Sequence, residues 1–140
     1  MPGEEPQGSA PREIILIVED NELNLKLLKD ILHVRGYSTV VTDLGAAAFD
    51  LARQHHPDLI LLDIQLPDVS GTEVARRLKA DEQTRAIPII AVTAFAMPGE
   101  RTDILDSGCD DYISKPLNIR EFLALVEHYT DRITTGADYS

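Results

Sequence analysis

Hydrophobic residues follow two alternating patterns along the chain. Short runs of β-branched and aliphatic residues are typical of strands buried on both faces. Between them, apolar residues recur every three or four positions, which is typical of amphipathic helices. The runs predict strands at 14–18, 38–41, 59–62, 87–92 and 112–113. The stretches that follow predict helices at 23–34, 45–54, 73–80, 100–107 and 119–126.

Glycine and proline residues mark the ends of several of these elements. Gly36 and Gly108 follow predicted helices, and Pro57 separates the second helix from the third strand. Glycine is a frequent C-terminal stop for helices. Strands that alternate with helices are joined by right-handed crossovers, which give a parallel sheet covered on both faces. The pattern therefore predicts an α/β fold with a five-stranded parallel sheet and five flanking helices.

The chain of 140 residues is long enough for one compact domain with a substantial core. Residues 1–12 are rich in Pro, Gly and Glu and have no apolar period, so we expect a flexible N-terminal tail. We expect a second flexible tail at 131–140 and a single domain over 13–130.

Charge and composition restrict the classes of partner. A net charge of −11 opposes nucleic-acid phosphates and anionic membranes, so neither is an expected partner. The sequence has neither an apolar run of about 20 residues nor the layout of a secretory signal at its start. Cys109 is the single cysteine, which excludes an internal disulfide and suits a cytoplasmic protein.

Polar residues stand directly after four of the predicted strands. They are Glu19 and Asp20 after the first strand, Asp63 after the third, Thr93 and Ala94 after the fourth, and Lys115 after the fifth. In parallel α/β sheets, binding sites lie at the carboxyl ends of the strands. We therefore expect three carboxylates, one hydroxyl and one ammonium group around one crevice.

This combination of groups predicts a phosphoryl-acceptor site. Clustered carboxylates repel one another, and Mg²⁺ relieves the repulsion because it binds carboxylate and phosphate oxygens. A carboxylate can then attack phosphorus and form an aspartyl phosphate. Lys115 and Thr93 offer a charge and a hydroxyl donor to the new phosphoryl oxygens. Asp63 is the expected phosphoacceptor.

Taken singly, several of these residues have an ordinary structural explanation. The run 19–21, Glu-Asp-Asn, is also a good helix cap, and Thr93 and Lys115 are common residues at a strand end and in a loop. The combination favours the site. The bond before Pro116 is a candidate cis peptide that would aim Lys115 into the crevice.

Two other features favour structural interpretations. The adjacent His55 and His56 lack a matching Cys or His pair, so we expect surface residues at a helix end rather than metal ligands. Cys109, after Gly108, is expected to be a small, semi-buried residue.

Four segments resemble the signature segments of two-component response-regulator receiver domains. They are LIVEDN, LILLDIQLP, IIAVTA and YISKP, which occur in the family's order within residues 13–130. The resemblance implies a flavodoxin-like strand order of 2-1-3-4-5, the order that a well-known member of this family illustrates.

The resemblance also implies partners and roles. A sensor histidine kinase or a phosphotransfer protein would donate a phosphoryl group to Asp63. The Mg²⁺ ligands would be Asp20, Asp63 and the backbone oxygen of Gln65, with Glu19 acting through a coordinated water. The phosphoryl oxygens would be bound by Thr93, the backbone amide of Ala94, and Lys115. The protein would catalyse its own phosphorylation and slow dephosphorylation without being a turnover enzyme.

A conformational switch is the output that the resemblance implies. Thr93 would move toward the phosphate and Tyr112 would turn inward, which is a shift between two populations. The surface over residues 96–130 would then bind a downstream protein. Phe95, Ala96 and Met97 form an apolar stretch beside it, and Phe95 is expected to slow the entry of water to the phosphate.

The segments VEDNELN, DIQLP and VTAFAM look like a branch of small regulators without an output domain. The alternatives are a receiver fragment of a larger regulator or hybrid kinase, and a docking module that takes no phosphate. A haloacid-dehalogenase-type phosphatase is disfavoured because position 65 is Gln where its nucleophile motif has a second Asp. A flavodoxin-like flavin binder is disfavoured because Glu19 and Asp20 would repel the flavin phosphate.

Overall fold

A computed structural model describes residues 13–94 and 97–130 of the chain. The two predicted tails lie outside the described residues, as do Phe95 and Ala96. None of the described helices is both long and apolar enough to cross a membrane.

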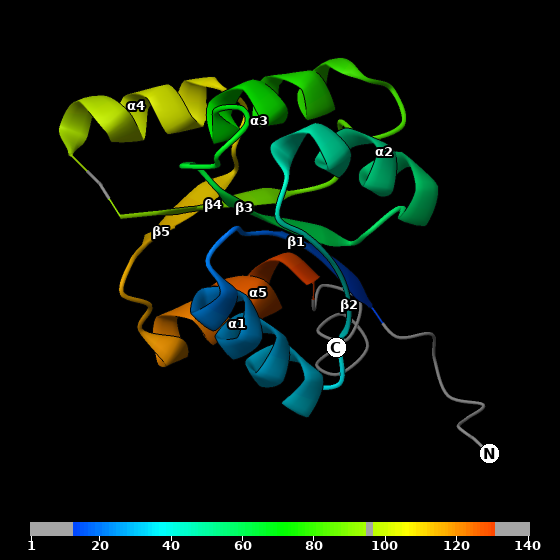
Figure 1. The fold of residues 1–140 in the computed structure, drawn as a ribbon, viewed down its shortest axis with the longest axis vertical. Helices are drawn as coiled ribbons and strands as arrows, with labels where there is room; N and C mark the ends of the chain where they lie inside the picture. The colour runs from blue at the N-terminus through cyan, green and yellow to red at the C-terminus, as the bar shows by residue number, and fades with distance from the viewer. Residues whose placement is uncertain (1–12, 95–96, 131–140) are drawn as a thin grey trace, which may run out of the picture.

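The described chain forms one parallel sheet with helices on both faces (Figure 1). The strands are β1 (Ile14–Val18), β2 (Ser38–Thr42), β3 (Leu59–Asp63), β4 (Ile89–Thr93) and β5 (Asp111–Ser114). The helices are α1 (Glu22–Val34), α2 (Gly45–His55), α3 (Gly71–Ala80), α4 (Pro98–Asp106) and α5 (Ile119–Thr130). The strand order is β2-β1-β3-β4-β5, which confirms both the predicted fold class and the order implied by the family resemblance.

Side chains of the central strands alternate between two hydrophobic cores. Ile15 and Ile17 of β1 pack with Phe122 of α5 on the face that α1 and α5 cover. Leu16 and Val18 belong to the core beneath α2, α3 and α4 on the other face. Because both faces are covered, the central strands read as continuous apolar runs.

Some predicted boundaries were wrong by one or two residues. β4 begins at Ile89 rather than at position 87, since Pro88 has no amide hydrogen to donate to a ladder. Asp63 is the last residue of β3 and pairs with Val92, rather than following the strand. Cys109 is buried, at 5% exposure, and not semi-buried.

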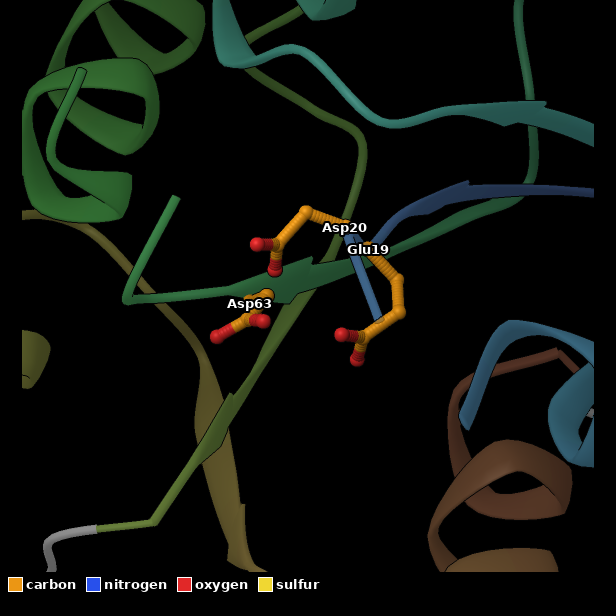
Figure 2. Close-up of side chains that lie close together, drawn as sticks. All are labelled: Glu19, Asp20 and Asp63. Carbon is orange, nitrogen blue, oxygen red and sulfur yellow. The ribbon is translucent and has the colours of Figure 1, made fainter. Parts of the chain in front are cut away.

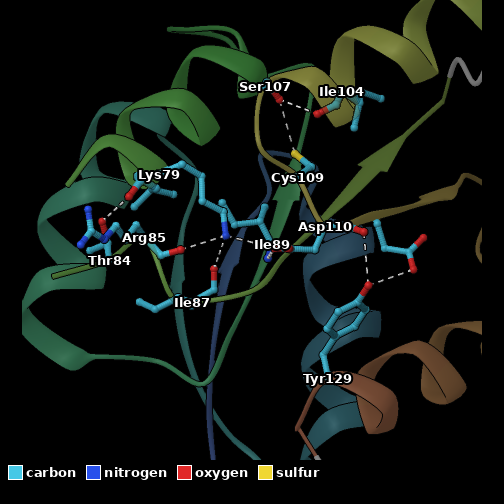
Figure 3. A network of polar contacts seen from close by, with 12 residues as sticks. Lys79, Thr84, Arg85, Ile87, Ile89, Ile104, Ser107, Cys109, Asp110 and Tyr129 are labelled. Atoms are coloured by element: carbon cyan, nitrogen blue, oxygen red, sulfur yellow. Dashed lines mark hydrogen bonds and ion pairs between the residues drawn. The ribbon is translucent and has the colours of Figure 1, made fainter. Parts of the chain in front are cut away.

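Lys79 of α3 joins chain segments at the amino ends of the strands (Figure 3). Its ammonium group donates to the carbonyls of Arg85 (3.2 Å) and Ile87 (2.9 Å) and lies 3.1 Å from Asp110 Oδ2. The same Asp110 oxygen accepts the amide of Ile89 at 2.8 Å. One cation therefore joins α3, the start of β4 and the loop before β5.

A Lys79→Met variant is expected to lose about 1–3 kcal/mol of unfolding free energy, because two carbonyls and a carboxylate lose their common donor. Urea denaturation measures the loss. Lys26→Met is the matched control: Lys26 forms an exposed ion pair with Asp30 at 2.8 Å, which contributes at most about 0.5 kcal/mol. Equal losses in the two variants would contradict the structural role of Lys79.

Candidate metal and phosphate site

Three carboxylates converge at the carboxyl edge of the sheet (Figure 2). Glu19 and Asp20 follow β1, and Asp63 ends the neighbouring strand β3. One oxygen from each of the three lies within 4.8 Å of the others. Glu19 and Asp63 are almost fully buried, at 1% and 2% exposure, whereas Asp20 is exposed. The strand order thus brings together side chains that are more than forty positions apart in the sequence.

Lys115 supplies the positive charge among these carboxylates. Its ammonium nitrogen lies 3.2 Å from Asp63 Oδ2 and 3.5 Å from Glu19 Oε2. The Lys115–Pro116 peptide bond, a candidate from the sequence, is cis. The backbone amide of Lys115 donates to the Thr93 carbonyl at 2.8 Å, which fixes the loop after β5 against β4.

The Glu19 carboxyl is only partly satisfied by protein groups. Oε2 accepts the Asn21 amide at 3.1 Å, but Oε1 has no hydrogen-bond partner within the described part of the chain. Burial, and then the neighbouring Asp63 carboxyl, raise the pKa of Glu19 from its ordinary 4.5 to about 7. A hard divalent cation fits this set of oxygen donors, because it would offset the negative charge that Glu19 and Asp63 bring into a buried position.

The raised pKa makes the unfolding free energy depend on pH in magnesium-free buffer. Between pH 4.5 and about 7 the unfolded chain releases the Glu19 proton while the folded chain retains it. The parent should therefore lose about 2–3 kcal/mol of unfolding free energy as the pH rises through this window. Urea denaturation of the parent and of Glu19→Gln at several pH values measures the difference between them. An unchanged difference across the window would contradict the expectation.

Thr93 ends β4 and is fully buried. Its hydroxyl donates to Glu100 Oε1 of α4 at 3.3 Å. Glu100 was not predicted from the sequence, since nothing in the spacing shows that the first turn of α4 reaches back to the end of β4. The following residue, Ala94, is exposed.

Gln65 and Asn21 hold the carboxylates in place from the adjoining loops. The backbone amide of Gln65 donates to Asp63 Oδ1 at 2.9 Å. Asn21 is the N-cap of α1, where its side chain accepts the Asn24 amide at 2.9 Å. The capping interpretation of run 19–21 therefore holds for Asn21 alone, while Glu19 faces Lys115.

Tyr112 is half-buried on β5, and its ring centroid lies 5.8 Å from the guanidinium carbon of Arg101. A cavity of about 440 Å³ separates this part of β5 from α5 and is lined in part by Tyr112, Glu121 and Leu125. Met97 is 68% exposed. The predicted roles of Phe95 and Ala96 fall outside the described residues.

His55 and His56 lie where the surface interpretation predicted, at the end of α2. His55 is the last helical residue, and the exposed His56 adopts a φ of 49° after it. They are remote from the three carboxylates, since α2 ends at the edge of the sheet opposite to the site.

Comparison with known proteins identifies the class to which this fold and site belong. Residues 15–127 match the response regulator receiver domain, and the chain belongs to this family. The polar-differentiation response regulator DivK of Brucella ovis is 56% identical over 115 residues, which are 82% of this chain and 94% of DivK. DivK of Brucella anthropi is 54% identical over the same shares of the two chains. The family resemblance found in the sequence is confirmed.

Solved structures agree with this assignment. The receiver domain of sensor histidine kinase PA1611 from Pseudomonas aeruginosa is 33% identical, with a TM-score of 0.80 over 86% of this chain and 99% of its own. That protein has a magnesium ion coordinated in its active site cleft. A CheY-like receiver domain protein from Methanospirillum hungatei is 28% identical, with a TM-score of 0.81 over 90% of this chain and 99% of its own.

Proposed function

We propose that this chain is a DivK-type regulator that accepts a phosphoryl group on Asp63 and thereby changes its contacts with other proteins. One observation carries the proposal: the buried Asp63 carboxyl lies 3.2 Å from the Lys115 ammonium group and beside two further carboxylates. An aspartate with a purely structural role would need only the Lys115 ammonium group as its partner. The two additional carboxylates add repulsion unless a metal ion is bound.

The phosphoryl group would come from a phosphohistidine of a sensor histidine kinase or phosphotransfer protein. A carboxylate oxygen of Asp63 attacks phosphorus, the bond between phosphorus and nitrogen breaks, and the leaving imidazole takes up a proton. Bound Mg²⁺ supplies positive charge that offsets the carboxylates and the phosphoryl oxygens. The expected ligands are Asp20, Asp63 and the backbone oxygen of Gln65, with Glu19 acting through water.

Lys115 and Thr93 would bind the transferred group. The Lys115 ammonium already contacts Asp63, so it reaches the phosphoryl oxygens with little movement. The Thr93 hydroxyl would have to leave Glu100 and turn toward the phosphate, where the amide of Ala94 would also donate. Tyr112 would turn inward as part of the same shift. The cavity between β5 and α5 supports a protein-binding surface over α4, β5 and α5.

The proposed compartment is the cytoplasm, with no nucleic acid or membrane as partner. The net charge of −11 supports the exclusion of polyanions. The chemistry is a self-catalysed transfer followed by slow hydrolysis, and its output is the altered protein surface rather than a released product.

Incubation of the protein with acetyl phosphate and Mg²⁺ tests the proposal. Mass spectrometry is expected to show the gain of one phosphoryl group, and peptide mapping should place it within residues 59–71. A chelator added before acetyl phosphate should prevent the gain. Failure to gain the group in Mg²⁺, or a gain that the chelator does not affect, would overturn the proposal.

Glu100 is expected to act as a positioning residue for Thr93. Its hydrogen bond favours the unphosphorylated arrangement, so Glu100→Ala should bind the acyl-phosphate mimic beryllofluoride about three- to tenfold more tightly. Glu100→Gln keeps an acceptor oxygen and should resemble the parent. Isothermal titration in Mg²⁺ measures both affinities. Equal affinities for the alanine variant and the parent would show that the hydrogen bond does not restrain Thr93.

A further inference from the structure

A groove lies between α2 and α3, which run side by side on the face of the sheet away from α1 and α5 (Figure 1). Its volume is about 300 Å³. The apolar part of its lining comprises Ala46, Phe49, Val69 and Val74. The groove is therefore separate from the carboxylate site and from the proposed surface over α4, β5 and α5.

Two cationic side chains converge on one aromatic ring of this groove. The guanidinium carbon of Arg77 lies 4.3 Å from the ring centroid of Phe49, and that of Arg53 lies 5.6 Å from it. Neither arginine forms an ion pair with any described residue. Arg53 has one long hydrogen bond, to Gln83 Oε1 at 3.4 Å. Two like charges held on one ring repel each other, so an anion placed between them would be stabilised.

Two carboxylates at the groove already have partners. Glu73, which lines it, forms an ion pair with Arg76 at 3.0 Å. Asp68 accepts the amides of Gly45 and Ala46 at 3.0 and 2.9 Å, and these bonds hold the pKa of Asp68 below its ordinary value. α3 carries three cationic residues and one acidic residue in a chain whose net charge is −11. Because Glu73 is paired with Arg76, Arg77 in the lining and Arg53 beside the Phe49 ring remain to attract an anion.

We infer that this groove binds an acidic segment of a partner protein. A carboxylate of the segment would lie between Arg53 and Arg77, and a bulky apolar side chain would pack on Ala46, Val69 and Val74. The volume is at the lower end for small-molecule pockets, which suits one or two side chains. A planar ligand such as a nucleobase is disfavoured because Arg77 already covers the Phe49 ring. The inference does not depend on phosphorylation of Asp63.

An NMR titration of the full, unphosphorylated chain in Mg²⁺ tests the inference. The probe is an eight-residue peptide of alternating aspartate and leucine, and the controls replace its aspartates by asparagine or its leucines by serine. The aspartate–leucine peptide should shift backbone amides within 45–53 and 69–77, with a dissociation constant below about 1 mM. Both control peptides should bind at least about fivefold more weakly, because each lacks one of the two complementary features.

Variants of the chain separate this groove from general electrostatic attraction. Arg53→Gln and Arg77→Gln should each weaken binding of the aspartate–leucine peptide at least about fivefold. Arg120→Gln removes the same charge from an exposed position on α5 and should leave binding unchanged. Equal losses in all three variants, or shifts spread outside the groove, would overturn the inference.

Two other results would assign the groove to a different occupant and also overturn the inference. The first is tighter binding of adenosine monophosphate than of the peptide at the same amides. The second is a change in the chemical shifts of these amides with protein concentration alone, which would indicate a second copy of the chain in the groove.

Discussion

The Asp63→Asn variant is expected to gain no phosphoryl group from acetyl phosphate and to be more stable than the parent in magnesium-free buffer. The first effect follows because asparagine lacks the nucleophilic carboxylate. The second follows because the Asp63 carboxyl, close to Glu19, contributes to the raised pKa of that residue. An amide at position 63 removes the charge repulsion between two buried groups.

The stability gain should be about 1 kcal/mol at pH 7, which corresponds to a change of roughly one pKa unit at Glu19. Urea denaturation measures it, and mass spectrometry of the same samples measures phosphoryl uptake. Saturating Mg²⁺ should cancel the gain, since it stabilises the parent by binding the folded state. A variant that is less stable than the parent without Mg²⁺ would show that the Asp63 carboxylate stabilises the fold through Lys115 more than it destabilises it through Glu19.

Asp68→Asn is the matched control for this result. It makes the same chemical change in the loop that follows Asp63, where the carboxylate accepts two backbone amides at the start of α2. Loss of that charge should lower the stability, the opposite sign to the effect at position 63. Phosphoryl uptake should be retained.

Gly71→Ala is expected to destabilise the protein strongly and to damage the site as well. A Cβ atom at position 71 would lie 2.5 Å from the Asp63 carbonyl oxygen and 2.6 Å from the Ile64 Cα. Both are backbone atoms, which cannot rotate away as a flexible side chain can. The strand end that carries the phosphoacceptor would have to shift, at a cost of about 3 kcal/mol.

Thermal denaturation and Mg²⁺ titration together check the Gly71→Ala expectation, because the melting temperature and the affinity for Mg²⁺ should both fall. Gly99→Ala is the control. Its new Cβ would meet no atom within 4 Å, and alanine in the helix should stabilise α4 by about 0.5–1 kcal/mol. A Gly71→Ala variant as stable as the parent would contradict the close approach.

The sequence predicted the strands and the polar residues at their ends because both are local features. A buried strand such as β3 is an unbroken apolar run, and Asp63 stands out at its end. The strand order required the family resemblance, since hydrophobic periodicity does not say which strands are neighbours. The start of α4 was predicted two residues late, because Pro98 and Gly99 interrupt a weak helical pattern.

Contacts between distant elements could not be predicted from the sequence. The hydrogen bond from Thr93 to Glu100 depends on the angle at which α4 leaves the sheet. The contact of Arg77 with Phe49 depends on the packing of two helices, α2 and α3. The Lys79 contacts combine three chain segments. None of these pairs has a spacing that distinguishes it from other arginines, lysines or acids on exposed helix faces.

The anchoring of the loop before β5 has a mechanical consequence for α4. Lys79 and Asp110 fasten the chain just beyond the carboxyl end of this helix, while its first turns meet the sheet through the 3.3 Å hydrogen bond from Thr93 to Glu100 and the contact of Arg101 with the Tyr112 ring. We expect a helix held in this way to rotate about its carboxyl end when the Thr93 hydrogen bond is lost. Release of Thr93 should therefore give the largest displacement near Met97 and the smallest near Ser107, so that a small rotation of one hydroxyl is amplified along the length of α4.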